Sequence, residues 1–186
     1  YRGVYRSNIV VNRTPGIEGM SEEKKTRIIS EARFLRAFYY HILWKFWGSI
    51  PYYTVNPNGA EVGYIVPQLT EDEVYEKIME DLDAATAPGA LPKAVAMTEV
   101  GRANRYAAYM LRADVVMLKG DESRYASVLE QLRETINSGI YDLTPKFEDI
   151  WTDKGEWNCE SIFEINYSDD PSNRTWEDPL APGGTV

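Results

Sequence analysis

The sequence is poor in cysteine, in histidine and in positive charge. Its 186 residues include one cysteine, Cys159, and one histidine, His41, which excludes an internal disulfide framework, a cysteine-rich zinc site and a multi-histidine metal site. The chain has 20 lysines and arginines against 29 aspartates and glutamates, for a net charge of −9. So acidic a chain lacks the overall basic character of nucleic-acid-binding proteins. Nucleic acid is therefore not an expected partner.

The sequence also has no run that is long and apolar enough to span a bilayer. Its most apolar stretch, 34–47, is interrupted by Arg36, His41 and Lys45, and a membrane helix needs about 20 apolar residues. The chain begins at Tyr1 without the basic and apolar regions of a signal peptide. Its last residues, 178–186, resemble a loop. We expect a processed chain or a piece of a longer one, in which any N-terminal lipid would lie outside this chain.

Aromatic residues, in contrast, are abundant. The chain contains 5 Trp, 13 Tyr and 5 Phe, which together make up 12% of its residues. Hydrophobic residues at 44% and charged residues at 26% are typical of a globular domain, and the length suits a single domain or a fragment of one. The number of tyrosines and tryptophans is therefore the compositional feature that needs an explanation.

Apolar periodicity and helix-end signals predict five helices. Ser21 is a good N-cap and Gly48 a good C-cap for the second helix, and Thr70 with Glu73 forms a capping box for the third. Alternating apolar residues predict one short strand over 161–167. The fold class is mainly α, with long loops and little β-strand. The helices are expected over about 2–12, 22–47, 71–87, 102–119 and 122–138.

The second and third predicted helices resemble the fourth and fifth in sequence. Aligned pairs such as Arg33 with Arg105 and Tyr75 with Tyr125 indicate two helix–turn–helix units, the first of which carries an inserted loop over 49–70. Stacked helical hairpins are the unit of tetratricopeptide-like arrays. We therefore expect tetratricopeptide-like hairpins over 1–140 and an irregular segment over 141–186 that holds the short strand.

Most polar residues on the predicted helices have a structural interpretation. Arg33 and Arg36 are expected to form ion pairs between helices, with Glu31 as a partner of one of them, and His41 is expected to be packed and hydrogen-bonded. Cys159 is interpreted as a buried, unreactive thiol. The aromatic residues expected in the core are Phe34, Phe38, Trp44, Phe46 and Tyr75.

Three motifs, in this order along the chain, resemble the markers of the RagB/SusD family. The first is the helix 31–40, EARFLRAFYY, followed by Gly48 and the dipeptide 50–51. The second opens with 101–103 and closes at 120–121. The third consists of 141–143, Phe147 and 160–165. The resemblance implies a surface lipoprotein of the outer membrane of Bacteroidetes that binds glycans or other nutrients and works with a TonB-dependent transporter. It also implies a protein that is not an enzyme and needs no cofactor.

The expected ligand-binding side is the segment 141–186. Exposed tryptophan and tyrosine rings stack on the apolar face of a sugar, and nearby amide, guanidinium and carboxylate groups bind its hydroxyls. Tyr52, Tyr53 and Tyr64 in the inserted loop are further candidates, and packing of the irregular part is the alternative role for these rings. The site residues predicted in this way are Tyr167, Trp176, Asn173, Arg174, Asp169 and Trp157.

Two other functions remain open at this stage. The helical hairpins suit a scaffold for protein–protein interaction. A glycoside hydrolase is only a remote alternative. Glycosidases use two carboxylates roughly 5 to 10 Å apart, whereas Glu160 and Glu164, four positions apart at the start of the predicted strand, would lie about 13 Å apart. The oxygen-rich stretch 169–173 lacks the spacing of an EF-hand loop, so the sequence does not decide whether calcium binds there. No catalytic residue, cofactor or resident metal is predicted.

Overall fold

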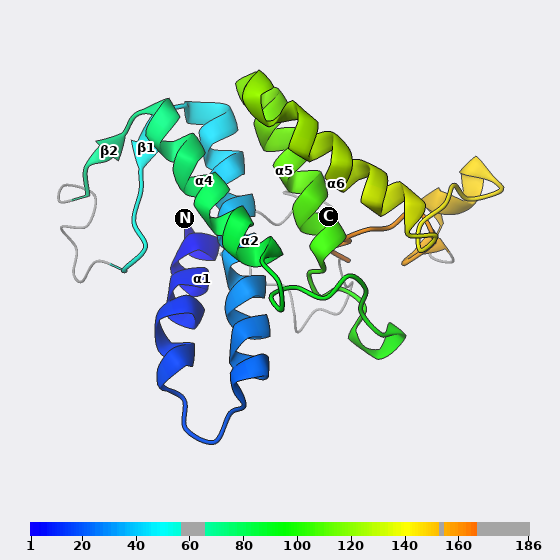
Figure 1. The fold of residues 1–186 in the computed structure, drawn as a ribbon, viewed down its shortest axis with the longest axis horizontal. Helices are drawn as coiled ribbons and strands as arrows, with labels where there is room; N and C mark the ends of the chain where they lie inside the picture. Colours follow the sequence, from blue (N-terminus) through cyan, green and yellow to red (C-terminus); the bar gives the residue numbers. More distant parts are fainter. Residues whose placement is uncertain (57–65, 153–154, 167–186) are drawn as a thin grey trace, which may run out of the picture.

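The computed structural model describes residues 1–56, 66–152 and 155–166. This part of the chain is mainly helical (Figure 1), which confirms the predicted fold class. Short 3-10 helices lie at Thr14–Gly16, Met97–Glu99, Glu122–Arg124 and Phe147–Trp151. The α-helices are α1 (Arg2–Arg13), α2 (Glu22–Trp47), α4 (Glu71–Thr86), α5 (Arg105–Lys119) and α6 (Tyr125–Asn137).

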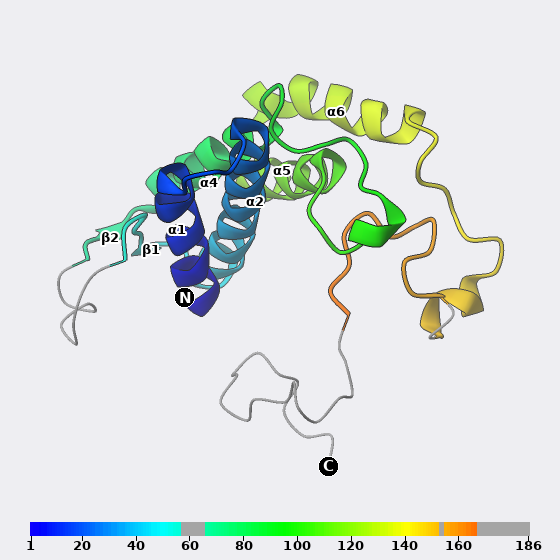
Figure 2. The ribbon, with the colours of Figure 1, turned by 90° about the horizontal axis from the view of Figure 1, so that it is seen from below.

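The helices pack as neighbouring antiparallel pairs around the long helix α2. Helix α1 lies beside the first half of α2 and α4 beside the second half, while α5 packs against α4 and α6 (Figures 1 and 2). The α2–α4 and α5–α6 pairs are the two hairpins that the sequence repeat predicts. In both views the β-strand pair and the segment 147–166 lie at opposite ends of the molecule.

The predicted helix ends of α2 and α4 are confirmed in detail. The Ser21 hydroxyl accepts a hydrogen bond from the backbone of Lys24, and Thr70 and Glu73 form both hydrogen bonds of a capping box. Gly48 ends α2 with φ of 63° and Gly120 ends α5 with φ of 71°. Only glycine adopts this backbone region without steric cost, so both residues stop their helices as expected.

The predicted starts of α5 and α6 are each three residues early. Helix α5 begins at Arg105 because the Asn104 side chain accepts a hydrogen bond from the backbone of Ala107 and thereby caps the helix. Helix α6 begins at Tyr125 because Asp121 caps a separate 3-10 turn ahead of it. In both places a polar side chain sets the helix start, and the apolar periodicity of the sequence does not show where that start lies.

The inserted loop contains a minimal sheet that the sequence does not predict. Strand β1 (Ile50–Pro51) pairs antiparallel with β2 (Gln68–Leu69), with Ile50 opposite Leu69. The Gln68 side chain also donates a hydrogen bond to the carbonyl of Ser49. This pairing closes the base of the loop and directs residues 52–56 back along α1 and α2.

The strand predicted over 161–167 is wrong for residues 161–166, which contain a bend at 162–163 and are otherwise irregular. A strand needs a partner to take up its backbone hydrogen bonds. Here the carbonyl of Ile162 instead accepts a hydrogen bond from the Asn104 side chain at 3.0 Å, and no strand lies alongside within the described ranges. The Phe163 ring packs edge-on against Phe34, with centroids 5.2 Å apart.

The hydrophobic core lies between α1, α2, α4 and α5. Phe34, Trp44 and Tyr75 are buried in it, and Phe38 packs partly buried against it, as predicted. The prediction for Phe46 is wrong, because its side chain is 72% exposed and that of Trp47 is 66% exposed. Near its end, helix α2 carries apolar side chains on most sides, but the neighbouring elements among the described residues cover only some of these sides.

Candidate functional site

Five of the six predicted site residues lie outside the described residues. These are Tyr167, Trp176, Asn173, Arg174 and Asp169, and the same holds for Tyr64. The sixth, Trp157, lies in a turn between the 3-10 helix Phe147–Trp151 and the bend at 162–163. The structure therefore places Trp157 and leaves its association with the other five as a prediction.

Trp157 is half-buried and lines a small cavity. Its φ of 56° lies in the left-handed region, which is uncommon for a residue with a side chain. Its backbone N–H donates a hydrogen bond to Glu164 at 3.0 Å, and this contact holds the turn. The ring lies so close to Gly101 that a β-carbon there would meet it at 3.0 Å. The cavity, of about 200 Å³, also exposes atoms of Tyr141 and Arg102.

The carboxylates near Trp157 are engaged in local structure. Glu160 accepts hydrogen bonds from the backbone and hydroxyl of Thr144, and these bonds hold the pKa of Glu160 below its ordinary value. Glu164 accepts from the Trp157 backbone and from the Ser161 hydroxyl. Both carboxylates thus act as hydrogen-bond acceptors for neighbouring backbone and hydroxyl groups.

Cys159 is exposed, so the prediction of a buried thiol is wrong. Its carbonyl accepts a hydrogen bond from the backbone of Asp142 at 3.0 Å, which holds the backbone at this point. The residue stands in a tight turn that the hydrogen bond from the Ser161 N–H to the Asn158 carbonyl closes. Turns usually lie at the surface, so a cysteine in a turn is exposed even though cysteine as a residue type is usually buried.

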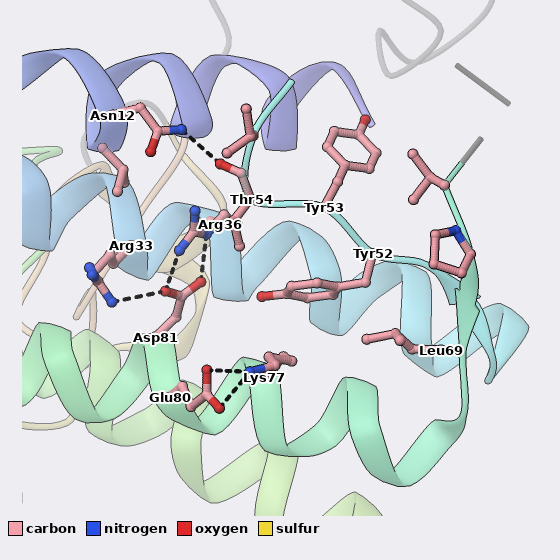
Figure 3. Close-up of a pocket in the computed structure, with 14 residues that line it drawn as sticks. Asn12, Arg33, Arg36, Tyr52, Tyr53, Thr54, Leu69, Lys77, Glu80 and Asp81 are labelled. Atoms are coloured by element: carbon pink, nitrogen blue, oxygen red, sulfur yellow. Dashed lines mark hydrogen bonds and ion pairs between the residues drawn. The ribbon is translucent and has the colours of Figure 1, made fainter. Parts of the chain in front are cut away.

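A larger cavity, of about 730 Å³, lies on the other side of α2, between that helix, α1, α4 and residues 52–55 (Figure 3). Its size falls within the range of small-molecule sites. Two of the further candidates from the sequence, Tyr52 and Tyr53, line it. We call it the α2–α4 cavity.

A buried ion pair forms one wall of the α2–α4 cavity. Arg36 Nε lies 2.7 Å from Asp81 Oδ2, and Arg36 Nη2 lies 2.7 Å from Asp81 Oδ1. Burial opposes the charge of Arg36, but the hydrogen bonds and charge of Asp81 outweigh it, so the pKa of Arg36 is raised. Arg36 also donates to Asn8 on α1, and this network joins three helices. The predicted helix-to-helix ion pair of Arg36 is confirmed.

Glu31 does not pair with Arg33 or Arg36, so that prediction is wrong. Its carboxylate instead accepts hydrogen bonds from Arg27 and, at 2.9–3.0 Å, from Arg102 ahead of α5. Glu31 and Arg33 are two positions apart and therefore face different sides of α2. Two motifs that are far apart in the sequence, 31–40 and 101–103, thus meet through a bidentate ion pair.

Tyr52 and Tyr40 form a stacked pair at the inner end of the α2–α4 cavity. Their ring centroids are 4.0 Å apart, and the Tyr40 hydroxyl is hydrogen-bonded to both the N–H and the C=O of Tyr53. Burial, followed by the negative charge of Asp81, raises the pKa of Tyr52. Its phenol is therefore protonated at neutral pH and keeps an O–H donor toward the cavity.

His41 is buried and hydrogen-bonded, as predicted. Its Nε2 lies 2.7 Å from the carboxylate of Asp114 on α5. The other ring nitrogen, Nδ1, is buried without a partner among the described residues. This contact ties α2 to α5, and it is the packed role that the sequence favours for the histidine.

The outer surface of α5 and α6 carries exposed apolar side chains. Met117 is 64% exposed and Ile136 is 74% exposed, and Met110, Leu118 and Leu129 are also exposed. Phe46 and Trp47 at the end of α2 are exposed as well. Exposed apolar residues gathered on a few elements are typical of interaction surfaces, which is the structural sign expected for a helical scaffold.

Across 1–56, 66–152 and 155–166, no helix combines the length and apolar character needed to cross a membrane. In the same ranges no three residues among histidine, cysteine, aspartate and glutamate gather closely enough to hold a metal ion. The stretch 169–173, considered for calcium, lies outside them.

Comparison with known proteins relates the first two thirds of the chain to one family. Residues 1–117 match the SusD-like family described as "Starch-binding associating with outer membrane". The chain is 27% identical to SusD-like protein P25 of Formosa agariphila over 186 residues, which cover 100% of this chain and 34% of that protein. The chain thus spans about one third of the length of this relative.

Solved structures show the same fold. Surface glycan-binding protein A from Bacteroides thetaiotaomicron, in complex with laminarihexaose, superposes with a TM-score of 0.83 at 38% identity, over 91% of this chain and 34% of that one. A laminarin-binding SusD-like protein superposes with a TM-score of 0.78 at 28% identity, over 88% of this chain and 35% of that one. The helical arrangement described above is therefore similar to one part of these larger proteins.

Proposed function

Because the chain belongs to the SusD-like family, we propose that it takes part in non-catalytic binding of a glycan at the cell surface, at the outer membrane. The observation that carries the proposal is the likeness, at 38% identity and over 91% of this chain, to a surface glycan-binding protein solved with laminarihexaose. A second similar structure is of a laminarin-binding protein. Glucose oligosaccharides of the laminarin type are therefore the first ligands to test.

The carboxylates near Trp157 favour binding over hydrolysis. A glycosidase needs a general acid whose pKa is raised, so that it holds its proton until the sugar bond breaks. The pKa of Glu160 is instead lowered by the hydrogen bonds from Thr144. Glu164 is occupied by the Trp157 backbone and the Ser161 hydroxyl. Neither group is poised as a general acid, so the remote hydrolase alternative is not favoured.

We place the ligand-binding side in 141–186 and the scaffold in 1–140. Trp157 supports this placement, because its ring lines a cavity and is held by the backbone contact to Glu164 and by the approach to Gly101. A fixed ring binds a sugar face at little entropic cost. In this proposal Tyr167 and Trp176 add further stacking surfaces, and Asp169, Asn173 and Arg174 bind sugar hydroxyls.

The test is calorimetric titration of the full-length protein with laminarihexaose. We expect Trp157→Ala to weaken binding about tenfold or more, on the scale of the 1–3 kcal/mol that aromatic stacking contributes, and Tyr167→Ala with Trp176→Ala to weaken it further. Trp47→Ala is the matched control, because its side chain is 66% exposed and lies at the end of α2, outside 141–186. Unchanged affinity in all these variants would remove the site assignment, and release of reducing ends would contradict the non-catalytic role.

The second part of the proposal concerns a partner, a TonB-dependent outer-membrane transporter. The exposed apolar side chains on α5 and α6, such as Met117 and Leu118, support a protein contact on this face. Full-length protein carrying Met117→Glu with Leu118→Glu is expected to lose copurification of a large β-barrel protein that the unaltered protein retains. Equal recovery of the barrel by both forms would assign this face to another contact, as in the scaffold alternative.

A further inference from the structure

We infer that the α2–α4 cavity is a second binding site, which takes a saccharide unit carrying an anionic group. It lies on the face of α2 that packs against α1 and α4, whereas Trp157 packs toward Gly101 and the start of α5. The inference stands apart from the proposed function, because it concerns a different cavity and a different ligand charge. Figure 3 shows the residues that carry it.

The first observation is the unequal sharing of Asp81 between two arginines. Arg36 takes both carboxylate oxygens at 2.7 Å, so Arg33 reaches Asp81 only at 3.5 Å, the limit of a hydrogen bond. This is the single polar contact of the Arg33 side chain within the described residues, and the side chain is 35% exposed. A guanidinium has five N–H donors in a fixed fork. Arg33 therefore presents several donors to the cavity.

The second observation is the charge of the lining. Arg33, Arg36 and Lys77 stand against Glu80 and Asp81, so the cavity is cationic although the chain as a whole has a net charge of −9. Lys77 and Glu80 form an exposed pair at 2.8–2.9 Å. Exposed pairs of this kind hold their partners weakly. The Lys77 ammonium can thus turn to a ligand beside Arg33.

The third observation is the mixture of apolar and hydrogen-bonding surface. Tyr52, fixed by its stack on Tyr40, lines the cavity, and Leu69 and Pro67 extend the apolar wall. In Figure 3 the Tyr52 hydroxyl points toward the Arg36–Asp81 pair. At about 730 Å³ the cavity exceeds what a bare anion needs and fits a sugar ring. A ring with hydroxyls and one carboxylate or sulfate ester matches this surface.

The experiment titrates the full-length protein with three size-matched probes: an oligogalacturonate, a sulfated galacto-oligosaccharide and a neutral galacto-oligosaccharide. We expect at least one acidic probe to bind more tightly than the neutral one, with affinity that falls as salt is added. Arg33→Met should weaken that binding roughly tenfold or more, which is the scale of a lost hydrogen bond to a charged group. The acidic probe that binds identifies the anionic group.

Two further variants keep the outcome interpretable. Arg133→Met is the matched control, because Arg133 lies on α6 in an exposed pair with Glu130, and it should bind like the unaltered protein. Lys77→Met tests the same cavity without touching Asp81. Acidic probes that bind no better than the neutral one, or full affinity in both cavity variants, would overturn the inference. Laminarihexaose binding is measured separately, so a failure of the proposed function is distinguished from a failure of this one.

Discussion

The helical part, 1–140, and the irregular part described over 141–166 are held together in different ways. In the helical part, buried polar contacts join residues far apart in the sequence, such as Arg36 with both Asp81 and Asn8. In the irregular part, many contacts are local, such as Ser161 with Glu164 or Asn158 with Gly155. The first arrangement fixes helices relative to one another, and the second shapes a surface.

This difference indicates where changes in sequence are tolerated. A local turn held by exposed hydrogen bonds is altered at small cost to the whole domain. A change to a buried ion pair that joins three helices costs much more, because the loss of one partner leaves an uncompensated charge in the core. We therefore expect binding properties to vary through the irregular part while the helical part keeps the fold.

The largest expected effect comes from the buried pair. Asp81→Ala leaves Arg36 without its partner, and we expect a loss of about 3–5 kcal/mol in the free energy of unfolding. Urea denaturation followed by circular dichroism measures it. Glu130→Ala, which removes an exposed partner of Arg133, should change stability by less than about 1 kcal/mol. Similar losses in the two variants would erase the contrast between buried and exposed polar contacts.

The second effect concerns alkaline pH. Burial, helped by neighbouring Tyr53, raises the pKa of Tyr1 to about 12, and burial also raises the pKa of Tyr40 and of Tyr75. These folded-state values lie above the ordinary value near 10, so the stability they contribute is complete below pH ~10 and is lost as pH rises through the folded values.

Denaturation series at increasing pH, combined with ultraviolet titration of tyrosinate, test this expectation. The helical circular-dichroism signal should be lost over the same pH range in which the tyrosines with raised pKa values ionise, because these rings pack in the helical part. Tyr1→Phe is expected to remove one late-ionising group. A free energy of unfolding that stays constant as the tyrosines ionise would show that they do not report on the helical core.

The third effect lies at the junction of the two parts. Gly101 has φ of 93°, and a β-carbon there would lie 3.0 Å from the Trp157 ring. Gly101→Ala should cost about 1–3 kcal/mol through backbone strain and shift the fluorescence of Trp157. Gly16→Ala is the control, because it has open space around its β-carbon position. Unchanged fluorescence in Gly101→Ala would mean that Trp157 is not packed against this turn.

The smallest effect is expected inside the irregular part. Thr144→Val removes the hydroxyl that holds the Glu160 carboxylate, and the pKa of Glu160 should rise toward its ordinary value. Since the pKa of Glu160 is lower in the folded state, this contact stabilises the fold at pH values above the ordinary pKa of a glutamate. That stabilisation is lost as the pH falls through the lowered pKa of the folded state. NMR titration of Glu160 measures the shift, with Thr152→Val as a control. An unchanged titration would assign the lowered pKa to the Thr144 backbone alone.

Much of the helical part is predictable because its determinants are local. Ser21 and Thr70 with Glu73 mark two helix starts, and Gly48 and Gly120 mark two ends, each through a backbone rule that needs no distant partner. The sequence repeat also predicts that these helices pair into two hairpins. The sequence does not show which apolar side chains are covered by other elements. Phe34 and Phe46 both lie in the apolar second half of α2, but Phe34 is buried against Phe163 whereas Phe46 is 72% exposed.

The α2–α4 cavity is harder to predict because it depends on contacts across the sequence. Arg33 faces it only because Arg36 has taken both oxygens of Asp81, which lies 45 residues further along the chain. Tyr52 lines it because β1 and β2 close the inserted loop and direct the chain back along α2. The sequence marks the tyrosines as candidates but does not bring them together with the arginine.

The exposure of Cys159 has a practical consequence for studying this molecule. It is the only cysteine in the chain, and it lies two positions after Trp157. A maleimide dye therefore attaches at one defined place without any engineering, because the chain offers one cysteine side chain and it is exposed. Its carbonyl is anchored to Asp142, so the label sits on a fixed piece of backbone. If the ligand binds at Trp157 as proposed, the emission of such a dye should change when the ligand arrives.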